Sequence, residues 1–370
     1  MECIFLTDVL TKRQRVEAAL DLQPVDRVPI LEQLSYNPRV IADWTGKAIE
    51  GFDYTLDDIC AVIRLASDLI MPPLAPRGRG RYTTADGFVY QDDEWTTWRV
   101  SRPFCTVEGA RKWLERRTEA LEAAAPDPAA ARAAHRAELT DLQGQIGETV
   151  ILKYHDVGFC AAYDSLGLEL FSYLVHDHPH VFARYMAISG ARALEWVEAV
   201  ADPALSPVIL IAEDFATKQG PLFPPDFLAR HHYPRVEACV AAWHTAGVKV
   251  LYHSDGNYRK AIPDLMACGV DGFYCLEPGV GMDLVELKQT WPEMVWSGGI
   301  DGVDLMERGT PGQVRAEVLR HIRETDALRT GGMFVATSSE INPPIPPENF
   351  RAMVAAVGEL RNTDLDPRGA

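Results

Sequence analysis

Short apolar runs alternate with longer helical patterns along the whole chain. Eight runs of β-branched or apolar residues predict strands, at 28–31, 68–71, 150–154, 208–212, 248–252, 271–275, 295–298 and 333–336. Runs this uniformly apolar are typical of parallel strands that are covered on both faces. The segments between them have helical patterns, at 11–22, 53–66, 108–147, 166–200, 226–246, 257–268, 283–290 and 310–329, and a closing helix is expected at 347–361.

Eight strands that alternate with helices favour a closed (β/α)8 barrel, the TIM barrel, over an open sheet. No GxGxxG motif follows the first strand, which removes the main reason to expect a dinucleotide-binding fold. We therefore expect an α/β protein in which residues 1–370 form a single barrel domain.

Two segments after the second strand depart from this alternation. Residues 81–100 predict a β-hairpin with its turn at Ala85-Asp86-Gly87. Residues 108–147 are rich in Ala, Arg and Glu and are interrupted at Pro126-Asp127-Pro128, which predicts a pair of solvated helices on the outside of the barrel.

Charge and composition exclude several classes of partner. The net charge of −17 argues against binding to nucleic acid or to an anionic membrane, because both require a basic surface. No run of 18 or more apolar residues predicts a membrane span, and the first ten residues do not resemble a signal peptide. The seven cysteines are odd in number and lack CxxC spacing, which favours a reducing compartment and predicts a cytoplasmic protein.

Ionisable or polar side chains follow most of the predicted strands. The endings after the third to eighth strands are His155-Asp156, Glu213-Asp214, His253-Ser254-Asp255-Gly256-Asn257, Glu277, Gly298-Gly299-Ile300-Asp301 and Thr337-Ser338-Ser339-Glu340. In a barrel of this type the carboxyl ends of the strands surround one shared bowl, where catalytic groups lie. We therefore expect Glu213, His253, Glu277 and Asp301 to converge on a common cavity.

His253 is the first candidate, because an imidazole can act as an acid, a base or a metal ligand near neutral pH. Asp255 could orient that ring, coordinate a metal beside it, or cap the following helix. Glu213, Glu277 and Asp301 are candidates for acid/base groups or hard-oxygen metal ligands, with structural salt bridges as the alternative. Arg77, after the second strand, could hold an anionic group of a ligand or remain solvated.

The sequence resembles the uroporphyrinogen decarboxylase superfamily, which includes cobalamin-dependent methyltransferases, over residues 11–361. The resemblance rests on an ordered set of motifs: 11–15 (TKRQR), 24–29 (PVDRVP), 67–70 (SDLI), 213–214 (ED) with 220–222 (GPL), 253–257 (HSDGN) and 298–301 (GGID). It implies a (β/α)8 barrel and an enzyme.

For a decarboxylase, the resemblance implies that Asp68 contacts the substrate's pyrrole nitrogens and that Tyr163 lies near the active site. The chain departs from that pattern at 32–36, where Glu32-Gln33-Leu34-Ser35-Tyr36 replaces an arginine-rich loop that binds acidic side chains of the substrate. A polycarboxylate substrate needs several cations in its pocket.

For a methyltransferase, the resemblance implies a zinc ion that acts as a Lewis acid. His253 matches the family's histidine ligand, whereas Asp255 and Ser338 or Ser339 stand where that pattern has cysteines. Zinc could still bind through His253, Asp255, Glu277 or Glu213, as a His/carboxylate site. Of these, His253, Asp255 and Glu277 are the predicted metal ligands.

We therefore predict an enzyme that transfers a methyl group from a small O- or N-methylated substrate to the cobalt of a separate corrinoid protein. The alternatives are a cofactor-free decarboxylase and a non-catalytic ligand-binding barrel. The predicted catalytic residues are His253, Asp68, Glu213 and Tyr163, and the predicted substrate-binding residues are Asp214, Asp301, Ser339, Glu340 and Arg77. Cobalamin would be present only on the partner protein, and a homodimer is the expected assembly.

Overall fold

The computed structural model describes residues 8–362, in which eight parallel strand positions form a closed ring. They are β1 (Leu31–Glu32), β2 (Leu69–Ile70), β6 (Val150–Ile151) continued by β7 (Lys153–His155), β8 (Val208–Ala212), β11 (Lys249–His253), β12 (Gly272–Tyr274), β13 (Val295–Ile300) and β14 (Met333–Thr337). β1, β2 and β6 pair in one group, and β7, β8, β11, β12, β13 and β14 pair in order in the other. A parallel bridge between Ile30 and Val335 joins β1 to β14 and closes the ring.

Successive residues of the strands are buried on opposite sides of the ring. On β8, Val208 and Leu210 belong to one buried cluster, whereas Ile209 and Ile211 belong to the other. The first cluster fills the barrel interior, and the second lies between the strands and the surrounding helices. Both faces of each strand are therefore buried, which is the physical reason why the runs are apolar without alternation.

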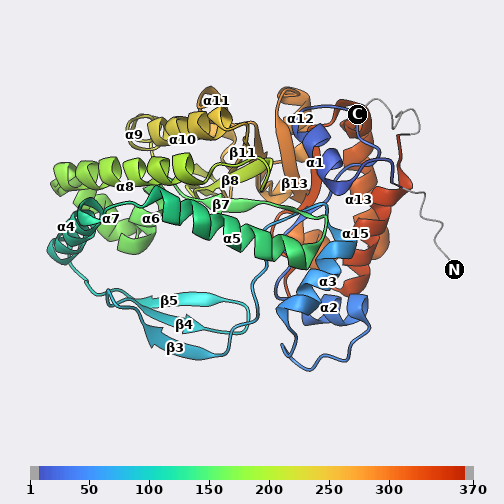
Figure 1. Ribbon diagram of the computed structural model, residues 1–370, viewed down its shortest axis with the longest axis horizontal. Coiled ribbons are helices and arrows are strands. Elements are labelled where there is room, and N and C mark those ends of the chain that lie inside the picture. The colour runs from blue at the N-terminus through green and yellow to red at the C-terminus, as the bar shows by residue number, and fades with distance from the viewer. Residues whose placement is uncertain (1–7, 363–370) are drawn as a thin grey trace.

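Fifteen helices accompany these strands in the described part of the chain. They are α1 (Lys12–Leu20), α2 (Pro38–Thr45), α3 (Leu56–Ala66), α4 (Val107–Ala123), α5 (Pro128–Ile146), α6 (Phe159–Leu166), α7 (Leu168–Asp177), α8 (Pro179–Val200), α9 (Pro225–His231), α10 (Tyr233–Thr245), α11 (Ile262–Ala267), α12 (Leu284–Thr290), α13 (Pro311–Glu324), α14 (Ala327–Thr330) and α15 (Pro347–Glu359). Figure 1 shows α5, α8 and α10 running alongside β7 and β8. None of the helices in residues 8–362 is long and apolar enough to cross a membrane.

The helix expected at 166–200 is divided in the structure. Gly167 separates α6 from α7, and α7 ends before Pro179, which occupies the first turn of α8. Proline lacks a backbone N–H and so favours the start of a helix over its interior.

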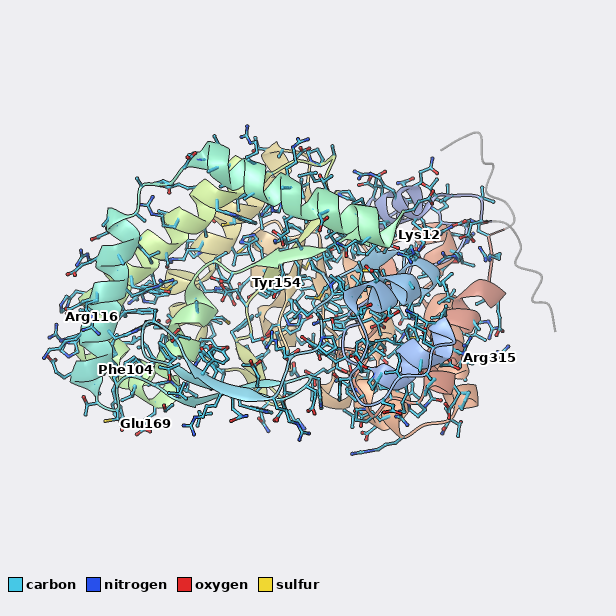
Figure 2. The ribbon with its side chains drawn as sticks, turned by 60° about the horizontal axis from the view of Figure 1, so that its bottom comes forward. Lys12, Phe104, Arg116, Tyr154, Glu169 and Arg315 are labelled. Atoms are coloured by element: carbon cyan, nitrogen blue, oxygen red, sulfur yellow. The ribbon has the colours of Figure 1, made fainter. Side chains whose placement is uncertain are left out.

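The segment after β2 corrects one prediction. Instead of a hairpin, three antiparallel strands form a separate sheet: β3 (Gly80–Thr83), β4 (Val89–Asp92) and β5 (Thr97–Ser101). The third strand was missed because a second reversal, at 93–96, lacks the Gly-containing turn that marks the first. Figure 2 shows Phe104 and Arg116, just after this sheet and on α4, at the opposite end of the molecule from Lys12 and Arg315.

Candidate active site

A cavity of about 740 Å³ lies at the carboxyl ends of the strands from β8 to β14. Eight residues that the sequence analysis singled out line it: Asp214, His253, Asp255, Glu277, Asp301, Ser338, Ser339 and Glu340. Strand ends far apart in the sequence therefore meet around one space, as expected for a barrel. The position of each residue is observed, whereas its chemical role remains a prediction.

Asp214, His253 and Asp255 form a compact triad in this cavity. The Nε2 atom of His253, the last residue of β11, lies 3.3 Å from Oδ1 of Asp214 and 3.8 Å from Oδ1 of Asp255. The backbone N–H of Asp255 donates to Oδ1 of Asp214 at 2.8 Å, which fixes the two acidic residues relative to each other. One potential ligand atom from each residue lies within 4.8 Å of the other two.

Gly256 allows the chain to turn directly after this triad. Its φ is +78°, and a Cβ atom there would lie 2.7 Å from the carbonyl oxygen of Thr217. A side chain would therefore be strained by the backbone conformation and would also clash. The N–H of Gly256 donates to Oε1 of Glu277 at 2.6 Å, which ties the loop after β11 to the end of β12.

The charges in the triad depend on one another. Burial lowers the pKa of His253, but Asp214 beside it outweighs burial and raises that pKa above its ordinary value. Burial raises the pKa of Asp214, but the bond to His253 lowers it overall. Burial raises the pKa of Asp255 to about 6, against the opposing charge of His253. The carboxylates thus favour a positive charge between them, either a proton on His253 or a bound cation.

The triad fits a divalent metal ion in its donor set and spacing. Tetrahedral zinc with ligands at about 2.1 Å places those ligands about 3.4 Å apart, close to the distances around His253 Nε2. One feature departs from known zinc sites: the Nδ1 atom of His253 is buried and has no hydrogen-bond partner among residues 8–362. A ligating histidine usually donates its second ring N–H to an acceptor that orients the ring.

Glu277 is a correction to the predicted metal ligands. It lines the cavity, but it does not belong to the group of converging ligand atoms, and its Oε1 accepts the N–H of Gly256. Asp214, which the sequence analysis assigned to substrate binding, takes its place beside His253.

The end of β13 and the end of β14 complete this side of the cavity. Oδ1 of Asp301 accepts the N–H groups of Val303 and Asp304, so this aspartate caps the short π-helix η3 (Gly302–Glu307). Ser338 accepts the N–H of Gly302 through its hydroxyl. The carboxylate of Glu340 has no hydrogen bond or ion pair to the described residues, so it is available to a ligand.

Glu213 faces away from the cavity, contrary to the expectation that it would share a common space with His253. Its side chain is fully buried, and its two carboxylate oxygens accept the N–H groups of Val157 and Cys160, both at 2.6 Å. These N–H groups lie at the start of α6. Glu213 therefore anchors the loop between β7 and α6 and does not line the cavity.

The buried position of Glu213 predicts a pH-dependent stability. Burial, with the nearby negative charge of Asp156, raises its pKa to about 7 from the usual 4.5. The folded chain therefore holds a proton on Glu213 that the unfolded chain loses between pH 4.5 and 7, so its contribution to stability is complete below pH 4.5 and is lost as the pH rises through 7. Urea unfolding at several pH values should show wild type losing up to about 3 kcal/mol relative to Glu213→Gln across this range. A difference that stays constant or grows with pH would contradict this assignment.

Asp68 is the largest correction to the predicted catalytic set. It precedes β2, at the end of the barrel opposite the cavity, whereas Met71, just after β2, lines the cavity. Its carboxylate is buried and bonds to Arg15 at 2.8 Å, to Arg27 at 2.6 Å and to the N–H of Ile30 at 2.9 Å. These bonds use both oxygens, so Asp68 holds the base of the barrel together and cannot reach a substrate in the cavity.

Arg77 and Tyr163 also lie outside the main cavity. Arg77 donates to Thr97 and lies 3.9 Å from Asp92, so it is bound to the inserted sheet. Tyr163 lines a second cavity of about 700 Å³ between α4, α6, α8 and the end of β7, where its hydroxyl accepts a bond from the thiol of Cys160. Asp214 lines both cavities, so the two spaces adjoin.

Tyr274 and Cys275 are among the residues of the main cavity that the sequence analysis missed. Both end the predicted strand 271–275, so the signal was the same strand-end position that identified His253. They were passed over because an aromatic residue and a thiol extend an apolar run, whereas a histidine or a carboxylate interrupts it. The Cys275 thiol donates to the carbonyl of Ser338 at 2.9 Å, and the ring of Tyr274 lies 5.5 Å from that of His253.

Comparisons with known proteins agree with this architecture. The sequence pattern of a family described as Uroporphyrinogen decarboxylase (URO-D) matches residues 161–360. A methyltransferase from Methanosarcina mazei has a similar structure, with a TM-score of 0.64 at 16% identity, over 95% of this chain and 99% of the other. A B12-independent methionine synthase from Shewanella sp. W3-18-1 gives a TM-score of 0.43 at 12% identity, over 90% and 98%, too low to carry an argument. No protein of curated function matches the sequence.

Proposed function

The chain belongs to the uroporphyrinogen decarboxylase family, and on that premise we propose that it transfers a methyl group from a small methylated substrate to a corrinoid protein. The resemblance noted from the sequence motifs is thus confirmed at the level of the family. The fold is shared with a methyltransferase, which supports the choice of reaction within the family without fixing it.

One observation carries the proposal: Asp214, His253 and Asp255 converge at the wall of a cavity large enough for a small molecule. These three residues would hold a divalent ion, for which zinc is the first candidate. When bound, such an ion supplies Lewis-acid chemistry that draws electron density from an oxygen or nitrogen bearing a methyl group.

In this reaction the residues of this chain bind and orient the methyl donor. The cavity wall places the donor beside the triad, so that its methyl carbon can face the corrinoid of the partner. As the bond between the methyl carbon and its oxygen or nitrogen breaks, the electron pair stays on that atom, which takes up a proton. The methyl group passes to the reduced cobalt of the partner, which is the second substrate of the reaction.

The structure does not favour the decarboxylase alternative. That alternative depended on Asp68, which is held in ion pairs at the base of the barrel. The cavity is also lined by more carboxylates than cations, which disfavours a polycarboxylate substrate.

Formation of a methylated corrinoid tests the proposal directly. Purified protein, loaded with zinc, is mixed anaerobically with cob(I)alamin and a panel of methyl ethers and methylamines, and the absorbance change that accompanies methylation of cobalt is followed. We expect at least one donor to methylate the cobalt in a protein-dependent manner. Donors that bind without any methyl transfer would favour the ligand-binding alternative and overturn the proposal.

A further inference from the structure

Two polar groups in the main cavity have no hydrogen-bond partner among the described residues. Tyr274 is only 3% exposed, it lines the cavity, and its hydroxyl has no hydrogen-bond partner among residues 8–362. The Glu340 carboxylate also lines the cavity, without a hydrogen bond or ion pair to the part of the chain that the structure describes. Both groups line the cavity and have hydrogen-bonding capacity that the described residues do not use, so a molecule that enters the cavity can bond to them.

Tyr274 offers a hydrogen-bond donor rather than a charge. A tyrosine phenol has an ordinary pKa of about 10, so this hydroxyl keeps its proton at physiological pH. A protonated phenol beside the triad can donate to an oxygen with a free lone pair. The ligand therefore carries a neutral acceptor atom, such as an ether oxygen, close to Tyr274 and His253.

The charge of the cavity is negative even after its internal pairs are counted. Its carboxylates are Asp214, Asp255, Glu277, Asp301, Asp304 and Glu340, and its basic residues are Lys218, His253 and Arg308. Arg308 is neutralised by Asp304 at 2.7 Å, and Lys218 is exposed in the turn between β9 (Ala216–Thr217) and β10 (Gly220–Pro221). A divalent ion at the triad would balance Asp214 and Asp255, which still leaves Glu340 without a positive partner.

We propose that the methyl donor is a small methyl ether that also carries a cationic nitrogen, with its ether oxygen at Tyr274 and the triad and its positive charge at Glu340. The assignment of the ether as the reacting end of this ligand rests on the proposed methyl transfer. The preference for a cationic ligand rests only on the negative charge of the cavity.

Matched probes test this selectivity without turnover. The cationic probe is (2-methoxyethyl)trimethylammonium, the neutral probe is 1-methoxy-3,3-dimethylbutane, in which carbon replaces the charged nitrogen, and the anionic probe is 3-methoxypropanoate. Ligand-observed NMR and calorimetry on the full-length, zinc-loaded chain should show the cation binding about tenfold or more tighter than the neutral isostere, as expected for one charge-assisted contact in a partly buried site. The anion should bind least.

Substitutions of single residues test which side chains cause the preference for the cationic probe. Glu340→Gln should reduce the preference for the cation to about twofold or less, and Tyr274→Phe should weaken the cationic and the neutral ether alike, because it removes the donor to the oxygen. Glu293→Gln removes the same charge from an exposed position outside the cavity and should leave all three affinities unchanged.

Equal affinity for the cationic and neutral probes, or tighter binding of the anion, would overturn this inference even if methyl transfer is demonstrated. Conversely, a clear preference for the cation in a protein that never methylates cob(I)alamin would uphold the selectivity and refute the reaction. The two proposals can therefore fail separately.

Discussion

Replacing His253 with alanine is expected to abolish specific metal binding. His253 supplies the one nitrogen of the triad, and its Nε2 lies between the carboxylates of Asp214 and Asp255. Two carboxylates alone form a weak site for zinc, which prefers nitrogen and sulfur donors. The affinity should fall by more than the roughly 10- to 100-fold that accompanies loss of an outer hydrogen-bond partner. Metal analysis and titration with Co²⁺, followed by its visible absorption, measure this loss without reference to activity.

His180→Ala is the matched control for this variant. His180 is an exposed histidine on α8, outside the cavity, so its removal should leave about one zinc per chain. Wild-type protein that binds no divalent ion at micromolar concentration would refute the metal site. A His253→Ala variant with wild-type affinity would instead assign the metal to other residues.

Replacing Arg15 with alanine is expected to cause a large loss of stability, with no direct effect on the cavity. The Arg15 side chain is fully buried and bonds to both oxygens of Asp26, at 2.7 and 2.8 Å, and to Asp68 at 2.8 Å. Its loss would leave the buried carboxylates of Asp26 and Asp68 without full compensation, a change that costs about 3–5 kcal/mol. Denaturant unfolding monitored by fluorescence measures the shift of the midpoint.

Arg111→Ala provides the contrast. Arg111 pairs with Glu108 and Glu115 on the surface of α4. Such exposed pairs contribute little to stability, so the unfolding midpoint should hardly move.

Asp68→Asn tests the same buried ion-pair network from its acidic side. It should destabilise the fold yet leave probe binding per folded molecule unchanged, whereas loss of binding or activity in a stably folded Asp68→Asn protein would restore a catalytic role for this residue.

The local pattern of the chain predicted most of the barrel. The eight apolar runs correspond to the eight strand positions, and Thr11, Thr55 and Thr310 each form the capping box that starts α1, α3 and α13. These features depend on neighbouring residues only, because burial on both faces and helix capping leave a signature within a few positions. Strand-end polarity likewise predicted that His253, Glu277 and Asp301 would share one cavity, but the same prediction was wrong for Glu213.

The tertiary structure decided which polar residues enter that cavity. Glu213 and Asp214 are adjacent, but one turns to the start of α6 and the other to His253, because successive side chains at the end of a strand point in opposite directions. The family resemblance predicted that Asp68 contacts the substrate, but this residue precedes its strand and is held at the base of the barrel. Its partners there, Arg27 and Arg15, lie 41 and 53 positions away along the chain. The sequence shows that a residue is polar and follows an apolar run. The direction of its side chain and its hydrogen-bond partners are decided by contacts between segments that are distant in the sequence.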